Sequence, residues 1–179
     1  MTEQELINYM SKSLSYDPIS GDFIYKVARG PRKAGDVAGT ICKHYGYRII
    51  GVGPKGSHRT YGAHRLAFLL MEGRWPGVID HRNGVRDDNR WENLRECTQQ
   101  QNCMNTSSRR GTSSKYKGVR RRVDIYYGEE CVRWLAQIYY NKKNIHLGYF
   151  VEEDDAARVY NLAARMYFGQ YSKINEIGR

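Results

Sequence analysis

The stretch VIDHRNGVRDDNRWENLRECTQQQNCMN, residues 78–105, gathers the polar side chains from which a hydrolytic site can be built. It opens on a short apolar run, passes through an Asn-Gly pair that favours a tight turn, and ends on a helical pattern at 98–104. Asp80 and His81 are neighbours, so in a strand they would point to opposite faces unless the strand ends there. We therefore expect a strand at 78–81 that ends beside the turn.

Phosphodiester hydrolysis requires a base that takes a proton from water and a hard cation that neutralises charge on the phosphate. An imidazole titrates close to neutral pH, so His81 can serve as the base. Carboxylate and amide oxygens suit Mg²⁺, and Asp80 and Asn102 offer such oxygens. An Asp-His pair alone is more typical of a turn acid beside a surface histidine, so the wider pattern has to decide.

That wider pattern covers residues 16–105, sparsely at first and densely from residue 62. The matching residues are His64-Arg65-Leu66-Ala67-Phe68, Ile79-Asp80-His81, Asn83-Gly84, Asp88-Asn89-Arg90, Asn93-Leu94-Arg95, Gln101-Asn102 and Asn105. Together they resemble the HNH homing endonucleases of phages and group I introns. The resemblance implies a ββα-metal finger in which His81 is the general base and Asn93 orients it. It also implies that Asp80 and Asn102 bind one divalent metal, Mg²⁺ or Mn²⁺.

Three further residues of this pattern need an interpretation. Asn102 is neutral where the family often has His, so we expect a single weak metal site that is poor for zinc. His64 is interpreted as a structural histidine at a helix start, with support of the site as the alternative. For Asn89, a turn residue and a supporting residue remain equal alternatives.

The chain divides at TSSRRGTSS, residues 106–114, whose small polar residues indicate a linker between domains at 1–105 and 115–179. Both domains are expected to be α+β: a ββα-metal nuclease module, then a small three-stranded antiparallel sheet packed on one helix. The predicted helices are 3–14, 64–71, 98–104 and 153–168, and the predicted strands are 23–27, 37–41, 47–52, 59–63, 78–81, 116–123, 133–140 and 144–150. The last helix should pack through Ala156, Tyr160, Ala163, Ala164 and Tyr167.

Residues 113–176 carry a second composite pattern. Its residues are Tyr116, Gly118, Val119, Arg120, Arg122, Trp134, Ala136, Ile138, Leu147, Gly148, Phe150, Ala156, Ala157, Tyr160, Ala163, Ala164, Gly169 and Asn175. The pattern resembles the plant APETALA/ethylene-response-factor DNA-binding domain, which implies that a three-stranded sheet enters the major groove. The expected DNA-binding residues are Lys117, Arg120, Arg122, Gln137, Tyr139 and His146. The base preference of the plant family is not expected here, because Lys117, Gln137, Tyr139 and His146 all depart from that family's residues. The alternative is that these charges form a solvated sheet face.

Composition narrows the class of partner. The 179 residues contain 29 Lys and Arg against 19 Asp and Glu, a formal charge of +10, which favours polyanions. No apolar run is long enough to span a membrane, and the N-terminus does not resemble a secretory signal. The four cysteines form no CxxC pair, so we expect reduced thiols in a cytosolic protein.

We therefore predict a metal-dependent, homing-type DNA endonuclease of phage character that acts in a bacterial cytoplasm. It would nick or cut double-stranded DNA at a site held by the C-terminal domain, with no membrane association and no obligatory protein partner evident. One alternative is a non-catalytic, sequence-specific DNA-binding regulator, which the intact set of site residues argues against. Another is a protein that binds or cuts RNA.

Overall fold

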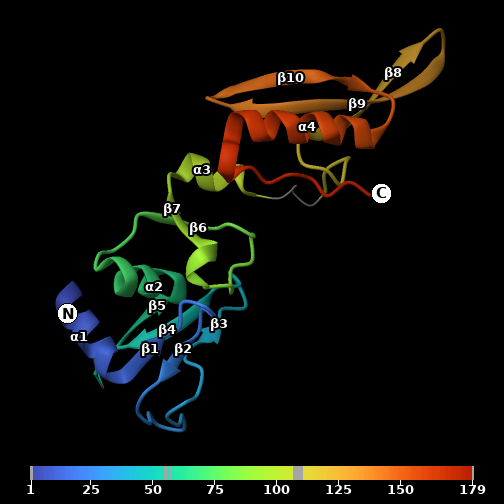
Figure 1. The fold of residues 1–179 in the computed structure, drawn as a ribbon. Coiled ribbons are helices and arrows are strands. Elements are labelled where there is room, and N and C mark those ends of the chain that lie inside the picture. The colour runs from blue at the N-terminus through green and yellow to red at the C-terminus, as the bar shows by residue number, and fades with distance from the viewer. Residues whose placement is uncertain (1, 55, 57, 107–110, 179) are drawn as a thin grey trace. The chain divides into compact units, whose positions relative to one another are not determined.

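The computed structural model describes residues 2–54, 56, 58–106 and 111–178, and the chain forms two compact units, Met1–Asn102 and Cys103–Arg179. Both are mixed α and β, with small antiparallel sheets and helices (Figure 1). The division falls inside helix α3, Gln99–Met104, ahead of the linker expected at 106–114. Residues 107–110 of that linker lie outside the described residues.

The helices of the first unit begin and end where local chemistry dictates. Helix α1, Glu3–Ser13, starts with a capping box in which Thr2 and Glu5 satisfy each other's backbone N–H groups. Helix α2, Ala63–Glu72, ends at Gly73, whose φ of 71° is the left-handed conformation that glycine adopts at little cost. Both helices bury an apolar stripe in one core, which contains Leu6, Met10, Phe23, Ile50, Val52, Leu66 and Leu69.

The strands of this unit form three small antiparallel sheets. Strand β1, Leu14–Tyr16, pairs with β2, Phe23–Tyr25, and β4, Arg48–Val52, lies between β3, Thr40–Ile41, and β5, Arg59–Gly62. Strand β6, Val78–His81, pairs with β7, Leu94–Cys97, after a short 3₁₀ turn at Trp91–Asn93. Strand β1 was not expected, because polar residues interrupt its short apolar run. Strand β7 is the second strand of the ββα finger that the resemblance implied, although the residue pattern alone indicated no strand there.

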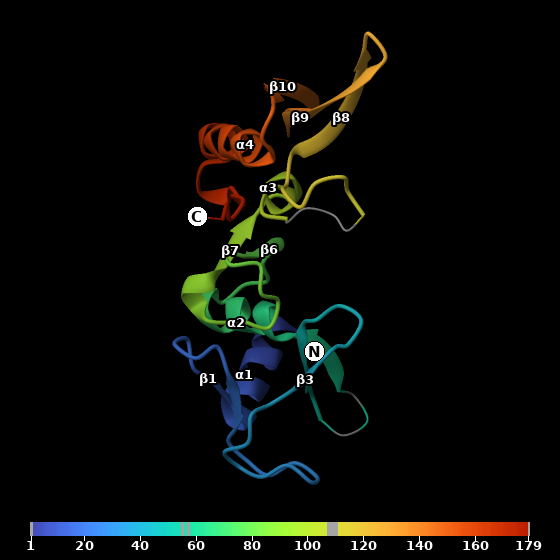
Figure 2. The same cartoon turned by 90° about the vertical axis from the view of Figure 1, so that its right-hand side faces the viewer.

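The second unit is a three-stranded sheet covered on one face by a helix. Strands β8 (Val119–Tyr126), β9 (Glu129–Tyr140) and β10 (Lys143–Phe150) lie in the order β10-β9-β8, and α4 (Glu153–Phe168) lies across them (Figures 1 and 2). The expected face of α4 is buried at Ala156, Tyr160, Ala163 and Ala164. Tyr167 is 38% exposed, so its assignment to that face was wrong. It packs at the edge instead, against Tyr140, with ring centroids 5.2 Å apart.

Gly118, just before β8, shows how closely the helix approaches the sheet. A Cβ atom there would lie 2.1 Å from the Tyr160 ring and 2.7 Å from the carbonyl of Gln137. Its φ of 76° also disfavours any other residue. The glycine therefore permits the contact between β8, β9 and α4.

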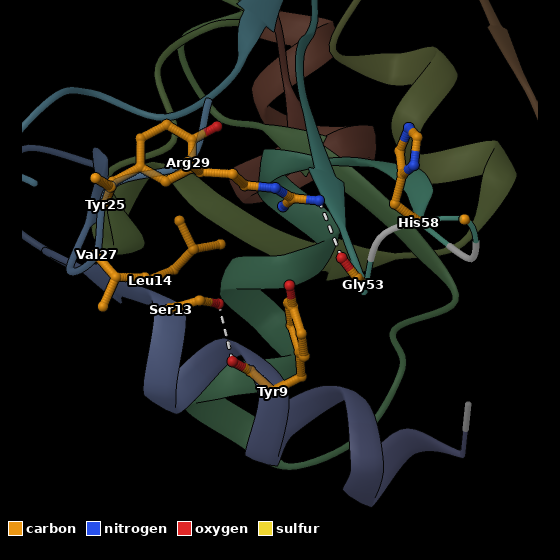
Figure 3. Close-up of a pocket in the computed structure, with 10 residues that line it drawn as sticks. Tyr9, Ser13, Leu14, Tyr25, Val27, Arg29, Gly53 and His58 are labelled. Atoms are coloured by element: carbon orange, nitrogen blue, oxygen red, sulfur yellow. Dashed lines mark hydrogen bonds between the residues drawn. The ribbon is translucent and has the colours of Figure 1, made fainter. Parts of the chain in front are cut away.

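The first unit contains a pocket of about 530 Å³ (Figure 3). Its lining includes Tyr9, Leu14, Tyr25 and His58, and Arg29, whose guanidinium donates to the carbonyls of Gly51 and Gly53. The residues that line it include neither Asp80 nor His81.

Within the described ranges, no helix is long and apolar enough to cross a membrane. None of the four cysteines, all of which are described, forms a disulfide.

Candidate active site

Strand β6 ends at His81, as the sequence predicted, and carries the Asp-His pair into the interior. Asp80 is 4% and His81 5% exposed. The pairing of β6 with β7 places Arg95 opposite Asp80, and both Nε and Nη2 of Arg95 donate to Oδ2 of Asp80, at 2.8 and 2.5 Å. Arg95 is itself only 7% exposed. The expected metal-binding carboxylate is thus half of a buried ion pair, which sequence analysis missed.

Two asparagines hold the loop that follows β6. The side chain of Asn93 bridges this loop: its Nδ2 donates to the carbonyl of Asp88 at 2.7 Å, and its Oδ1 accepts from the backbone N–H of Asn83 at 3.0 Å. Asn89 is 1% exposed, donates to the carbonyl of Asp87, and its side chain contacts His81. The bond to Asp87 fits a turn residue and the contact with His81 fits a supporting residue, so both interpretations of Asn89 stay predictions. Asn93 shapes the loop, and Asn89 reaches the imidazole.

Burial sets the protonation state of His81. Desolvation lowers its pKa below the usual value of about 6.5, although the contact with Asn89 opposes part of that shift. The charge of Arg86, in the same loop, acts in the same direction as desolvation. The imidazole is therefore neutral at pH 7 and able to accept a proton.

His64, the second residue of α2, lies beside this base. Its ring centroid is 5.4 Å from that of His81 at 73°, and 4.9 Å from that of Tyr47. Burial, followed by the charges of His81 and Arg65, lowers the pKa of His64 to about 4. Its Nδ1 is buried with no hydrogen-bond partner among the described residues. Gly62 makes room for the ring, since a Cβ there would lie 2.6 Å from it. The His64 ring therefore lies next to the proposed base, and both interpretations of His64 stay predictions.

The donor chemistry of the expected metal site fits a hard cation. Asn102 lies on α3, which directly follows β7, and its side chain is partly exposed. One carboxylate and one amide oxygen, completed by water, suit Mg²⁺ or Mn²⁺ better than zinc. In the part of the chain that the structure describes, no three His, Cys, Asp or Glu side chains gather as a metal cluster. The ligand roles of Asp80 and Asn102 stay predictions.

The second unit presents a polar face on the side of the sheet away from α4. In antiparallel pairing, opposite residues share a face. Arg120 pairs with Leu135, Arg122 with Arg133, and Gln137 with His146. Val119 and Ala136, one step along, are buried under α4. We call the outward residues Arg120, Arg122, Arg133, Gln137, Tyr139, His146 and Tyr149 the outer face. It includes five of the six expected DNA-binding residues, and it adds Arg133, which sequence analysis missed.

Lys117 is placed differently. Its Nζ donates to the carbonyl of Met104 at 2.6 Å and lies 5.9 Å from the centre of the Phe168 ring. Burial lowers the pKa of this amine to about 8. The lysine is engaged inside its own unit, on the helix side of the sheet, rather than grouped with the outer face.

Comparison with known proteins bears on the first unit most directly. Residues 61–104 match the family model described as HNH endonuclease. We call residues 61–104, which match this model, the HNH segment. The HNH segment therefore spans α2, β6, β7 and α3, and it includes His64, Asp80, His81, Asn93 and Asn102.

Individual relatives resemble different parts of the chain. An uncharacterized HNH endonuclease of Acanthamoeba polyphaga mimivirus is 36% identical over 117 residues, 64% of this chain and 57% of that protein. DNA endonuclease I-HmuI of Bacillus phage SP01 is 40% identical over 78 residues, 40% of this chain and 45% of the enzyme. Its solved structure, of DNA binding and cleavage by an HNH homing endonuclease, matches 51% of this chain and 49% of that chain, with a TM-score of 0.40 and 30% identity.

A plant protein matches over a shorter length. An AP2/ERF and B3 domain-containing transcription repressor of Arabidopsis thaliana is 41% identical over 75 residues, 42% of this chain and 19% of that protein. The chain thus spans about half the length of the viral and phage relatives and about a fifth of the plant protein.

Proposed function

We propose that this chain is a metal-dependent DNA endonuclease in which the HNH segment cuts the backbone and the second unit holds the DNA. The observation that carries the proposal is the arrangement at the end of β6: a neutral imidazole on His81, buried, contacted by Asn89 and adjacent to Asp80. A neutral base next to a carboxylate that suits a hard cation is what hydrolysis of a phosphodiester requires.

In this proposal each residue has a separate task. His81 accepts the proton of the attacking water. Asn93 and Asn89 fix the loop and the ring so that the imidazole needs no reorientation during the reaction. Asp80 and Asn102 would hold Mg²⁺ or Mn²⁺, which would neutralise charge on the phosphate and on the leaving oxygen. Arg95 donates to Asp80 from the neighbouring strand β7 and so fixes the orientation of that carboxylate.

The second unit would bind DNA through the outer face. Arg120 and Arg122 give it positive charge, whereas Arg133 is paired with Asp124 at 2.9 Å. Gln137, Tyr139 and His146 can make polar contacts with base edges. This is the manner of binding implied by the resemblance to the plant domain. The homing-type role and action in a bacterial cytoplasm belong to the same proposal.

A nicking assay on supercoiled plasmid tests it. With Mg²⁺ the parent protein should convert supercoiled to open-circular or linear DNA, and EDTA should stop the reaction. His81→Ala should lower the rate about 10²–10⁴-fold, because the base acts in the transition state, while leaving DNA affinity nearly unchanged. Binding by the parent without any cutting would contradict the proposal and indicate a regulator. Preferential binding of RNA in competition with duplex DNA would indicate an RNA-directed protein.

A further inference from the structure

Arg86 is a cation in the loop after β6 whose charge is not neutralised by a carboxylate. Asp87, next in the chain, pairs with Arg48 at 3.0 Å, and Asp88 pairs with Arg90 at 2.7 Å. Among the described residues no salt bridge engages Arg86, and its side chain is exposed. An exposed guanidinium flanked by acids that are already paired is available to an anion from outside the protein.

The guanidinium is nevertheless held in place. Its Nη1 donates to the carbonyl of Tyr45 at 2.8 Å, and its central carbon lies 5.2 Å from the centre of the Tyr47 ring. Tyr45 and Tyr47 flank Gly46 in the turn between β3 and β4, where Gly46 has a φ of 72° and its N–H donates to the carbonyl of Cys42. The turn provides a fixed support, so less side-chain freedom remains to be lost on binding.

This support borders the base. The Tyr47 ring that lies under Arg86 is 5.8 Å from the ring of His81, and 4.9 Å from the ring of His64. Arg86 and the imidazole of His81 thus lie near the same aromatic ring.

We propose that Arg86 is a catalytic residue that binds a non-bridging oxygen of the phosphate attacked by the water of His81. The inference rests on the proposed nuclease function and deepens it. The planar guanidinium matches phosphate geometry and is always charged. Negative charge redistributes over the phosphate oxygens during displacement, so a preorganised cation stabilises the transition state more than the bound substrate.

Three variants of the full chain test this assignment in the plasmid nicking assay with Mg²⁺. Arg86→Ala should lower kcat about 10²–10³-fold, as loss of a preorganised donor does in other hydrolases, with a much smaller change in KM. Arg86→Lys should recover part of the rate, because lysine keeps the positive charge but lacks the planar pair of N–H donors of the guanidinium. Arg82→Ala is the matched control: Arg82 is exposed in the same loop, so its removal costs the same net charge and should change kcat less than threefold.

Chemical rescue separates a role at the phosphate from a role in folding. Free guanidinium ion at low, non-denaturing concentration should restore several-fold activity to Arg86→Ala and none to Arg82→Ala, with thermal melting of both variants equal to the parent. If the parent nicks DNA and Arg86→Ala nicks at the same rate, the Arg86 assignment is wrong. The same holds if the rate of Arg86→Ala is lowered no more than that of Arg82→Ala. Either result would leave the proposed nuclease function unchanged. A parent that does not nick under any of these conditions overturns both.

Discussion

At the scale of single residues, the buried pair of Asp80 and Arg95 is the most consequential contact of the HNH segment. Removing one partner of a buried pair leaves an uncompensated charge, so Arg95→Leu should cost about 3–5 kcal/mol of unfolding free energy. Arg74→Leu is the control, because its pair with Glu96 is largely exposed and should cost about 0–1 kcal/mol. Urea unfolding measures the loss of unfolding free energy in both variants. Equal losses would show that the Asp80–Arg95 pair stabilises the fold no more than an exposed pair.

The same contact affects any test of the metal. Asp80→Ala would leave the buried Arg95 guanidinium without its carboxylate partner. A loss of activity could then come from lost metal binding or from lost folding. Asn102 is partly exposed, and Asn102→Ala gives a cleaner reading of activity against Mg²⁺ concentration.

His64 predicts how stability depends on pH. Its pKa of about 4 in the folded protein lies below the value of about 6.5 expected when unfolded, so between these values the unfolded state binds more protons. The stabilisation from a neutral His64 is complete above pH 6.5 and is lost as pH falls towards 4, by about 3 kcal/mol. Urea titrations at pH 7 and pH 4.5 check this. The drop between them should shrink in His64→Gln, and an unchanged drop would place the acid sensitivity elsewhere.

At the scale of elements, strand β8 carries arginines on both faces of the sheet, two on the outer face and one on the side of α4. Arg120 and Arg122 belong to the outer face, whereas Arg121 pairs with Trp134 on the side of α4, and all three are exposed. If the outer face binds DNA, Arg120→Ala and Arg122→Ala should each lower the slope of log affinity against log salt by about 0.9 for a phosphate contact. A base-reading arginine should instead cost about 1–3 kcal/mol at one sequence position.

Arg121→Ala is the matched variant for this measurement, since it removes the same charge from the other face of the same strand. Its affinity and salt slope should remain close to those of the parent. Equal effects of all three substitutions, measured by fluorescence anisotropy across a salt series, would show that the sheet acts only through its net charge.

At the scale of the whole molecule, the two units should divide cutting from holding. A chain that ends at Thr106 retains α3 and the complete HNH segment but lacks the sheet of the second unit. We expect it to nick plasmid at high enzyme concentration, with weaker affinity, a shallower salt dependence and less preference among sites. Footprinting and salt titration of the truncated and full chains measure this. Identical affinity, slope and preference would show that residues 107–179 do not hold the DNA.

The sequence alone determined those features that depend on neighbours along the chain. The bounds of α4 follow from its helical spacing, its acidic first turn and Gly169, and the common face of Arg120 and Arg122 follows from strand alternation. The Asp-His pair at a strand end was predictable because the Asn-Gly turn begins two residues after His81 at Asn83. Local geometry is sufficient for all of these.

Only the tertiary structure decided which residues from distant segments meet. Arg95 reaches Asp80 through the register of β6 and β7, His64 and Tyr47 border His81 because α2 and β4 pack in one core, and Lys117 turns away from the outer face towards the Met104 carbonyl. Such contacts form only after the apolar core has packed, when each buried charge or hydrogen-bond donor pairs with a group from another segment. The cost of leaving a polar group unsatisfied appears only in that packed interior, so no spacing along the chain records it.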